Sequence, residues 1–225
     1  MKPRHSQLLG ASILLVGAVI VICNSSVISS KYRSWRHEQR EERNRYSRLQ
    51  LFAGYLESAK TGDPVAQYNV GGFYAHGVAV ERNPEEAVKW WLKSAASGYA
   101  RAQSELGDCF SNGVGVTQDV AAGLNWHRLA AAHGDARSQI WLSKQYLDGG
   151  VVAIDKVEAY AYLTLAKRYA ETSLRPSEKS TVSSHSLLFS IDPAVTEETR
   201  TLGNKRADVL QKEIEAKIAA KKAGK

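Results

Sequence analysis

The chain has 225 residues, of which 44% are hydrophobic and 24% are charged, and its formal net charge is +7. This composition excludes an intrinsically disordered chain and supports one modest folded domain with accessory segments. Much of the positive charge lies in one short stretch and in the C-terminal tail, where it suits an anionic neighbour. The two cysteines, Cys23 and Cys109, exclude a disulfide framework because Cys23 lies in an apolar N-terminal run.

An apolar run follows a short N-terminal tail, residues 1–7. Residues 8–28 carry no charged side chain, and about 20 predominantly apolar residues are needed to span a bilayer. We therefore predict that residues 8–28 form an uncleaved transmembrane signal anchor. A cleaved signal peptide is the competing interpretation, although no A-x-A-like site of small residues follows the run. The third interpretation is a buried helix of a soluble domain.

Residues 29–48 form a basic stretch, predicted to be a solvated, partly helical stalk. Only Lys2 and Arg4 precede the apolar run, whereas the stretch after it contains Lys31, Arg33, Arg36, Arg40, Arg43, Arg45 and Arg48. Because Lys and Arg accumulate on the cytoplasmic side of a membrane, this bias favours a cytoplasmic C-terminal domain. We expect a single-pass protein of a bacterial inner membrane, with a periplasmic domain as the alternative. Contact with anionic headgroups is compatible with this stalk.

The centre of the chain repeats every 36 residues. The stretches GDPVAQYNVGGFYAHGVAV (62–80) and GYARAQSELGDCFSNGVGV (98–116) share a frame that returns more loosely in GDARSQIWLSKQYLDGGVV (134–152). The superposed residues are Gly62, Gly98 and Gly134; Ala66, Ala102 and Ser138; Gln67, Gln103 and Gln139; Tyr74, Phe110 and Tyr146; Gly77, Gly113 and Gly149; and Trp90, Trp126 and Tyr162. This period is typical of solenoids built from helical pairs.

Each unit contains signals for two helices separated by a turn. In the first helix of the first unit, Ala66, Val70 and Tyr74 share one face, and an aligned glycine follows as a C-terminal cap. The second helix begins after a good N-cap residue in every unit, namely Asn83, Asp119 and Asp155. We predict that this helix points its aligned aromatic residue inward. Because one helical pair cannot bury its apolar face alone, stacked pairs would form an all-α solenoid.

The repeat resembles the Sel1-like repeat, a relative of the tetratricopeptide repeat with a longer internal turn. In the first unit the resemblance rests on Ala66, Gly71, Tyr74, Gly77, Val80, Ala87, Trp90, Ala95 and Gly98. In the second it rests on Ala102, Leu106, Gly107, Phe110, Gly113, Gly115, Val116, Trp126, Ala130, Ala131 and Gly134. The third unit departs at Ser138 and Ser143. The resemblance implies a repeat domain over residues 49–170: a half-unit cap, then units at about 62–97, 98–133 and 134–170.

Two segments follow the repeats. Residues 171–194 are predicted to be a loop whose apolar patch, Leu187, Leu188 and Phe189, packs on the last repeat. Residues 195–225 are predicted to form a C-terminal capping helix and a basic tail. The helix is predicted from apolar residues at helical spacing: Leu202, Val209, Leu210, Ile214 and Ile218. Solenoids need such polar-backed ends, and the tail is expected to be solvated.

No catalytic or cofactor motif emerges from the sequence. His127 and His133 are too far apart round a helix for the i, i+4 metal spacing, and His76 stands alone near a turn. We therefore expect no catalytic residue, cofactor or metal. Some secreted relatives of Sel1-like repeats are described as penicillin-binding or β-lactamase-like and carry regular cysteine pairs. This chain has neither those pairs nor an SxxK tetrapeptide, so an enzyme acting on cell walls or β-lactams is a minor alternative.

The resemblance implies an adaptor that binds its partner on a concave surface lined by the first helices. The residues facing away from Val70 and their counterparts vary between units, which suits a binding strip. We select as candidate partner-binding residues Tyr68, Asn69, His76, Glu105, Asp108, Asn112, Trp141, Lys144 and Asp148. Tyr68 and Trp141 favour binding because aromatic residues are typical interface anchors. An ordinary solvated face is the equal alternative.

The predicted function is therefore a membrane-anchored adaptor or scaffold that binds a protein or peptide. The principal alternative is binding of an anionic surface or polymer through the basic stalk and tail. Nucleic acid is not an expected partner.

Overall fold

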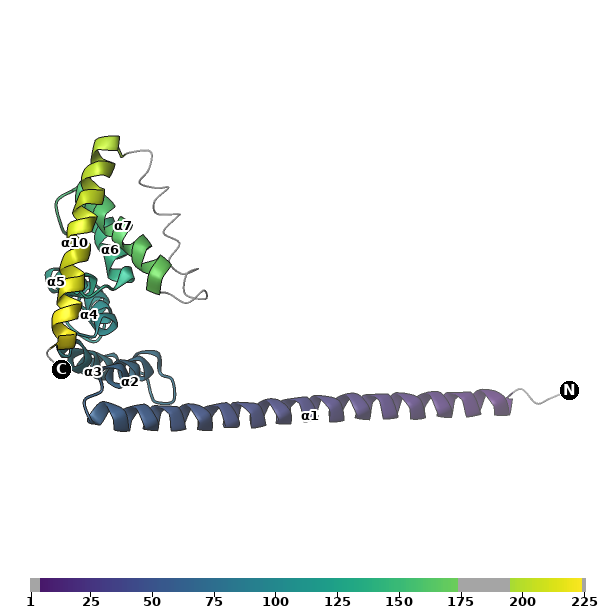
Figure 1. The fold of residues 1–225 in the computed structure, drawn as a ribbon. Coiled ribbons are helices and arrows are strands. Elements are labelled where there is room, and N and C mark those ends of the chain that lie inside the picture. Colours follow the sequence, from purple (N-terminus) through teal and green to yellow (C-terminus); the bar gives the residue numbers. More distant parts are fainter. Residues whose placement is uncertain (1–4, 174–194, 224–225) are drawn as a thin grey trace. The chain divides into compact units, whose positions relative to one another are not determined.

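The computed structural model describes residues 5–173 and 195–223, with side chains for residues 29–169, 195–220 and 223. These residues form eight helices: α1 (His5–Lys60), α2 (Pro64–His76), α3 (Pro84–Ala96), α4 (Ala100–Asn112), α5 (Val120–Ala132), α6 (Ala136–Asp148), α7 (Lys156–Ser173) and α10 (Glu197–Ala223) (Figure 1). The described part contains no strand, so the predicted all-α class is confirmed for it. The chain divides into two units, residues 1–51 and 52–225.

In the first unit, the side chains of residues 29–51 are all exposed along α1. Tyr32 and Trp35 are 50% and 53% exposed, and their ring centroids lie 5.9 Å apart. The Arg36 guanidinium lies over the Tyr32 ring and donates from Nη2 to the Tyr32 hydroxyl at 2.9 Å. The basic stretch is therefore helical and presents its aromatic rings, as well as its charges, to solvent.

Among the helices whose side chains are described, none is sufficiently long and apolar to cross a membrane. Residues 8–28, where we predict a transmembrane anchor, belong to α1, but their side chains lie outside the described set. The structure therefore does not support that anchor, which stays a prediction.

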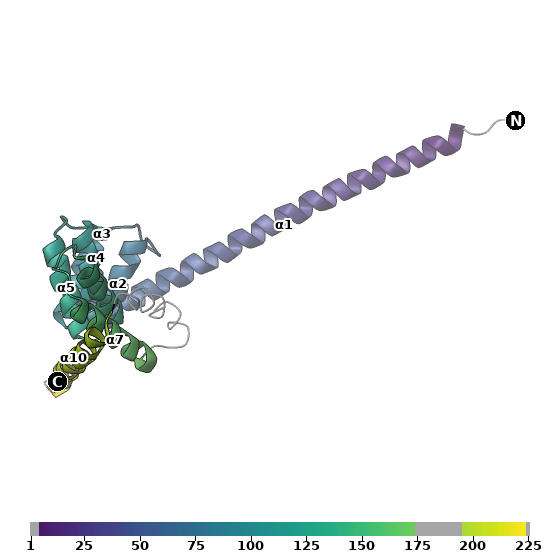
Figure 2. The same ribbon diagram turned by 90° about the horizontal axis from the view of Figure 1, so that it is seen from above.

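The second unit is built from three helical pairs. The pairs are α2–α3, α4–α5 and α6–α7, and further contacts join α3 to α4 and α5 to α6. We call α2, α4 and α6 the first helices and α3, α5 and α7 the second helices. The helices from α2 to α5 lie side by side in both views (Figures 1 and 2). The chain thus forms the short solenoid that the 36-residue period predicts.

The caps of these helices follow the repeated sequence signals. Asn83 Oδ1 accepts from the Glu86 amide at 3.0 Å, and Asp119 Oδ1 accepts from the Ala122 amide at 2.9 Å. Asp155 Oδ1 accepts from the amides of Val157 and Glu158. Each first helix ends at a glycine with left-handed φ, at positions 77, 113 and 149. Each of these caps stabilises a helix end by about 1 kcal/mol, and the predicted caps are confirmed.

A repeated glutamine ties each first helix to the preceding second helix. The side-chain amide of Gln103 donates to the Ala95 carbonyl at 3.1 Å, and that of Gln139 donates to the Ala131 carbonyl at 3.3 Å. Gln67 makes the same bond, at 3.2 Å, to the Ala59 carbonyl in α1. The end of α1 therefore occupies, relative to α2, the place that a second helix occupies relative to the next repeat.

The second helix of the first repeat buries two neighbouring tryptophans. Trp90 is half-buried and packs on the cluster of Ala59, Ala66 and Val70, which agrees with the prediction that it points inward. Trp91, which we did not select, is deeper, at 5% exposed. Its indole lies against Gly71, where an added Cβ would approach Nε1 to 2.5 Å, and Nε1 donates to the Tyr68 carbonyl at 3.1 Å.

The last helix, α10, packs against α7 and, more sparsely, against α5, which are both second helices. Its buried face consists of Gly203, Ala207, Leu210 and Ile214. The predicted apolar face is partly wrong, because Leu202 and Val209 are 45% and 47% exposed. The cause is Gly203, whose missing side chain lets α10 approach the Tyr160 ring. Residues 174–194, including the patch predicted to pack on the last repeat, lie outside the described residues.

Candidate functional site

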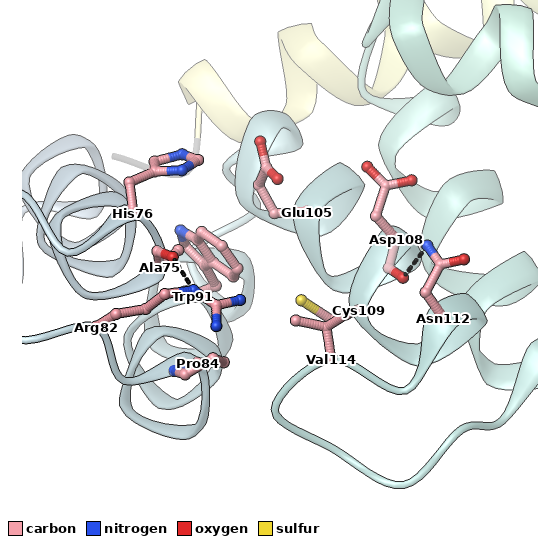
Figure 3. Close-up of a pocket in the computed structure, with 10 residues that line it drawn as sticks. All are labelled: Ala75, His76, Arg82, Pro84, Trp91, Glu105, Asp108, Cys109, Asn112 and Val114. Carbon is pink, nitrogen blue, oxygen red and sulfur yellow. Dashed lines mark hydrogen bonds between the residues drawn. The ribbon is translucent and has the colours of Figure 1, made fainter.

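A groove of about 410 Å³ lies at the first junction, between the pairs α2–α3 and α4–α5. Its lining residues come from both pairs and their turns: Ala75, His76, Arg82, Pro84, Trp91, Glu105, Asp108, Cys109, Asn112 and Val114 (Figure 3). We call it the first groove. It gathers four of the nine predicted site residues, namely His76, Glu105, Asp108 and Asn112.

One wall of the first groove is basic. The Arg82 guanidinium donates from Nε to the Ala75 carbonyl at 3.1 Å and has no carboxylate partner among the described residues. His76, the last residue of α2, is exposed and makes no hydrogen bond within the described part of the chain. Figure 3 shows both side chains on the side of the groove opposite Asp108 and Asn112. The Arg82 guanidinium and the His76 imidazole are therefore available to a ligand.

The opposite wall, on α4, is acidic, and its two carboxylates share one guanidinium. Glu105 Oε1 lies 3.0 Å from Arg137 Nη2, and Asp108 Oδ2 lies 3.8 Å from the same nitrogen. Burial alone would lower the pKa of the Arg137 guanidinium, but the carboxylates of Glu105, Asp108 and Asp135 together outweigh burial and raise it. Arg137, at the start of α6, thus offsets one of the two negative charges on this wall of the first groove from the third repeat.

The floor of the first groove is apolar. It contains the Trp91 indole, the Val114 side chain and the Cys109 thiol, which is 6% exposed. Burial, followed by the nearby carboxylates of Glu105 and Asp108, raises the pKa of the Cys109 thiol to about 11. The thiol therefore stays protonated at neutral pH, which suits a packing residue better than a nucleophile.

The remaining predicted site residues lie outside this groove. Tyr68 is half-buried, and its ring centroid lies 5.3 Å from that of Tyr99. The Tyr68 hydroxyl lies 3.5 Å from Glu105 Oε1, and burial followed by the Glu105 charge raises its pKa. Asn69 donates from its side-chain amide to the Val65 carbonyl at 2.9 Å. Tyr68 and Asn69 thus already make contacts within the repeat domain.

On α6, Lys144 and Asp148 are exposed, whereas Trp141 is half-buried. The Trp141 indole stacks on the His127 ring, with centroids 4.0 Å apart and an interplanar angle of 21°. Trp141 and His127 occupy, one period later, the positions of Glu105 and Trp91. An aromatic side chain therefore covers the floor of the second junction, between α4–α5 and α6–α7.

His127 also joins three helices in an arrangement that sequence reasoning missed. Its Nδ1 lies 3.3 Å from Ser138 Oγ, and its Nε2 lies 3.5 Å from Asp108 Oδ1. This set has the residue types of a Ser–His–Asp triad, but the Ser138 hydroxyl is fully buried and bonded to Ser104 Oγ at 2.9 Å. A nucleophile must reach its substrate, so the set is a structural bridge. Nothing in the spacing of these residues along the chain predicts it.

Among the described residues, no group of three His, Cys, Asp or Glu side chains could hold a metal ion. The first groove combines an apolar floor, a basic wall with free Arg82 nitrogens, and an acidic wall whose two carboxylates share Arg137.

The sequence profile of the Sel1 repeat matches residues 64–99, 100–135 and 136–168. The chain contains three Sel1 repeats. Their bounds begin two residues later than the units expected at 62, 98 and 134. Sel1 repeats generally mediate protein–protein interactions. No curated protein matches the sequence.

Two solved structures resemble the chain and its Sel1 repeats. One is a protective antigen present in uropathogenic Escherichia coli strains and displaying an SLR fold, with 25% identity and a TM-score of 0.62. The match covers 74% of this chain and 34% of the antigen, so the chain spans about a third of that protein's length. The other is a Sel1 repeat protein from Oxalobacter formigenes, with 29% identity, a TM-score of 0.46, and coverage of 49% of this chain and 48% of that one.

Proposed function

We propose that the chain is a non-enzymatic adaptor whose first helices bind a protein or peptide, with the first groove as the principal contact. The observation that carries this proposal is the combination, in one groove, of an apolar floor around Trp91 with the unpaired guanidinium nitrogens of Arg82 and the exposed imidazole of His76. Apolar pockets rimmed by a few polar groups are the usual form of specific recognition sites. Binding by Sel1 repeats in general supports the class of partner.

Site-specific photo-crosslinking tests this function. A benzoyl-phenylalanine in place of His76 should give a discrete adduct in cells, because that position borders the groove. The matched control replaces Leu92, which is 40% exposed on a second helix and does not line the groove. Adding Glu105→Trp should fill the groove as Trp141 fills the second junction, and the adduct should disappear. Equal adducts from both positions, or an adduct that survives Glu105→Trp, would refute the proposal.

Membrane attachment through residues 8–28 is part of the same proposal, with the repeats on the cytoplasmic side. The apolar run and the basic residues after it support this placement. Protease accessibility of a C-terminal tag tests it, in cells whose outer barrier is open and whose inner membrane is sealed. Protection until detergent is added is the expected result. Loss of the tag in sealed cells would place the repeats in the periplasm, and release of the chain by carbonate would exclude the anchor.

Binding of an anionic surface is the second candidate function. It is favoured by the exposed basic residues of 31–48 together with the exposed rings of Tyr32 and Trp35, since aromatic residues beside Lys and Arg suit a membrane interface. Flotation of the chain with vesicles containing phosphatidylserine should then fall steeply with salt and survive deletion of residues 62–170. Binding that is insensitive to salt would exclude this function.

A further inference from the structure

The charges of the first groove are unequally available to a ligand. Both carboxylates of the α4 wall face Arg137, and Asp108 also faces the buried His127 ring. On the other wall, Arg82 uses Nε for the Ala75 carbonyl, and its two terminal nitrogens make no bond among the described residues. A ligand entering the groove therefore meets two carboxylates that share the Arg137 guanidinium on one side and the free terminal nitrogens of Arg82 on the other.

The floor adds a preference for an apolar side chain. Trp91, Cys109 and Val114 offer no charged atom, and Trp91 Nε1 is already bonded to the Tyr68 carbonyl. A polar ligand group placed there would lose its hydrogen bonds to water without replacement, which disfavours it. An aliphatic side chain is favoured because it removes apolar surface from water.

From these two features we propose that the first groove binds a segment of a partner protein in which an apolar side chain adjoins a carboxylate. The apolar side chain covers Trp91 and Cys109, and the carboxylate pairs with the free Nη groups of Arg82 beside His76. A guanidinium and a carboxylate form strong paired hydrogen bonds. This inference rests on the proposed function, since it names the kind of segment that the adaptor recognises.

Fluorescence anisotropy with short labelled peptides tests this inference on the full-length chain in neutral detergent. The probes carry Leu-Glu, Leu-Gln, Leu-Lys or Ala-Glu between glycines and serines. We expect the Leu-Glu peptide to bind about tenfold more tightly than the Leu-Gln peptide, because a hydrogen bond to a charged group contributes about 1.5–3 kcal/mol and each 1.4 kcal/mol is tenfold. The Ala-Glu peptide should also bind about tenfold more weakly, because it leaves the floor uncovered.

Variants locate the binding. Arg82→Gln should abolish the preference for Leu-Glu over Leu-Gln. The control Lys156→Gln removes an exposed positive charge on α7, outside the groove, and should leave that preference unchanged. Glu105→Trp should weaken all the peptides by filling the groove. Circular dichroism checks that the variants fold, and His76→Gln provides a second, more conservative change on the same wall, with a smaller loss of Leu-Glu affinity expected than for Arg82→Gln.

The outcomes separate this inference from the proposed function. Preference for Leu-Lys, lost in Glu105→Trp, would overturn the carboxylate preference and leave the groove as a binding site. Preference for Leu-Glu that persists in Arg82→Gln would also overturn it, because the carboxylate would then bind elsewhere. If no peptide binds at millimolar concentration, the inference fails, and the crosslinking at position 76 still decides whether the first helices bind a protein.

Discussion

The two junctions between repeats share a backbone plan and differ in what lies over the floor. At the first junction, Glu105 is drawn toward Arg137 and leaves the Trp91 indole facing a groove. At the second, Trp141 holds the position of Glu105 and stacks on His127, which holds the position of Trp91. The same period therefore produces an open junction and a filled one.

This difference shows how a repeat protein separates binding from stability. The first junction leaves the Arg82 guanidinium and the His76 imidazole without a partner among the described residues, whereas the second fills the corresponding space with aromatic packing and a polar bridge through Ser138. Stacked aromatic pairs contribute about 0.5–1.5 kcal/mol beyond their buried area. We therefore expect changes at the second junction to act mainly on folding and changes at the first groove mainly on binding.

The largest effect is expected where the first junction needs close backbone contact. Gly115 has φ +71°, and an added Cβ would overlap the Pro84 carbonyl oxygen. Gly115→Ala should lower the free energy of unfolding by about 3 kcal/mol, combining left-handed strain with overpacking. Urea unfolding followed by circular dichroism measures it. The control Gly72→Ala, in open helical space, should raise stability by up to about 1 kcal/mol; similar effects at both sites would contradict the contact.

The next largest effect is expected at the second junction, from the buried imidazole of His127. His127→Ala removes a side chain that is 1% exposed and leaves Trp141 without its stacking partner. We expect a loss of about 2 kcal/mol in the free energy of unfolding. The exposed His76→Ala should change it by less than about 0.5 kcal/mol. Equal losses would mean that His127 does not organise the second junction.

A smaller effect sharpens the charge argument at the open junction. Arg137→Gln leaves Glu105 and Asp108 without their cationic partner, so affinity for the Leu-Lys peptide should rise about fivefold. Stability should fall by less than about 1 kcal/mol, because Arg137 is 53% exposed and such pairs are weak. Lys144→Gln, exposed on the same helix, is the control. An unchanged Leu-Lys affinity would show that Arg137 does not mask the acidic wall.

The smallest effect concerns the turn of the first repeat. Ala79 corresponds to Gly115 and keeps the left-handed conformation, with φ +68°, despite its Cβ. Ala79→Gly should raise the free energy of unfolding by about 0.5 kcal/mol, since relief of strain exceeds the entropy gained by the unfolded chain. Ala121→Gly, in an exposed part of α5, should lower it by roughly 1 kcal/mol. Destabilisation by Ala79→Gly would refute strain at this turn.

The sequence by itself determined the period, the helical pairs and their ends. Asn83, Asp119 and Asp155 predict helix starts because a side-chain oxygen caps the amides of its own next turn, which is a local interaction. Helical periodicity also predicts which positions of the first helices face away from the core. Four of those positions line the groove: His76, Glu105, Asp108 and Asn112.

Only the tertiary structure decided which aromatic residue is buried most deeply and which carboxylates face Arg137. Trp91 lies deeper than its neighbour Trp90 because Gly71 on another helix leaves room for it. Arg137 compensates Glu105 from 32 residues away, and His127 meets Asp108 and Ser138 across three helices. These contacts depend on the angles at which the helices cross. Because side chains from several repeats set those angles together, the pattern within one repeat does not predict them.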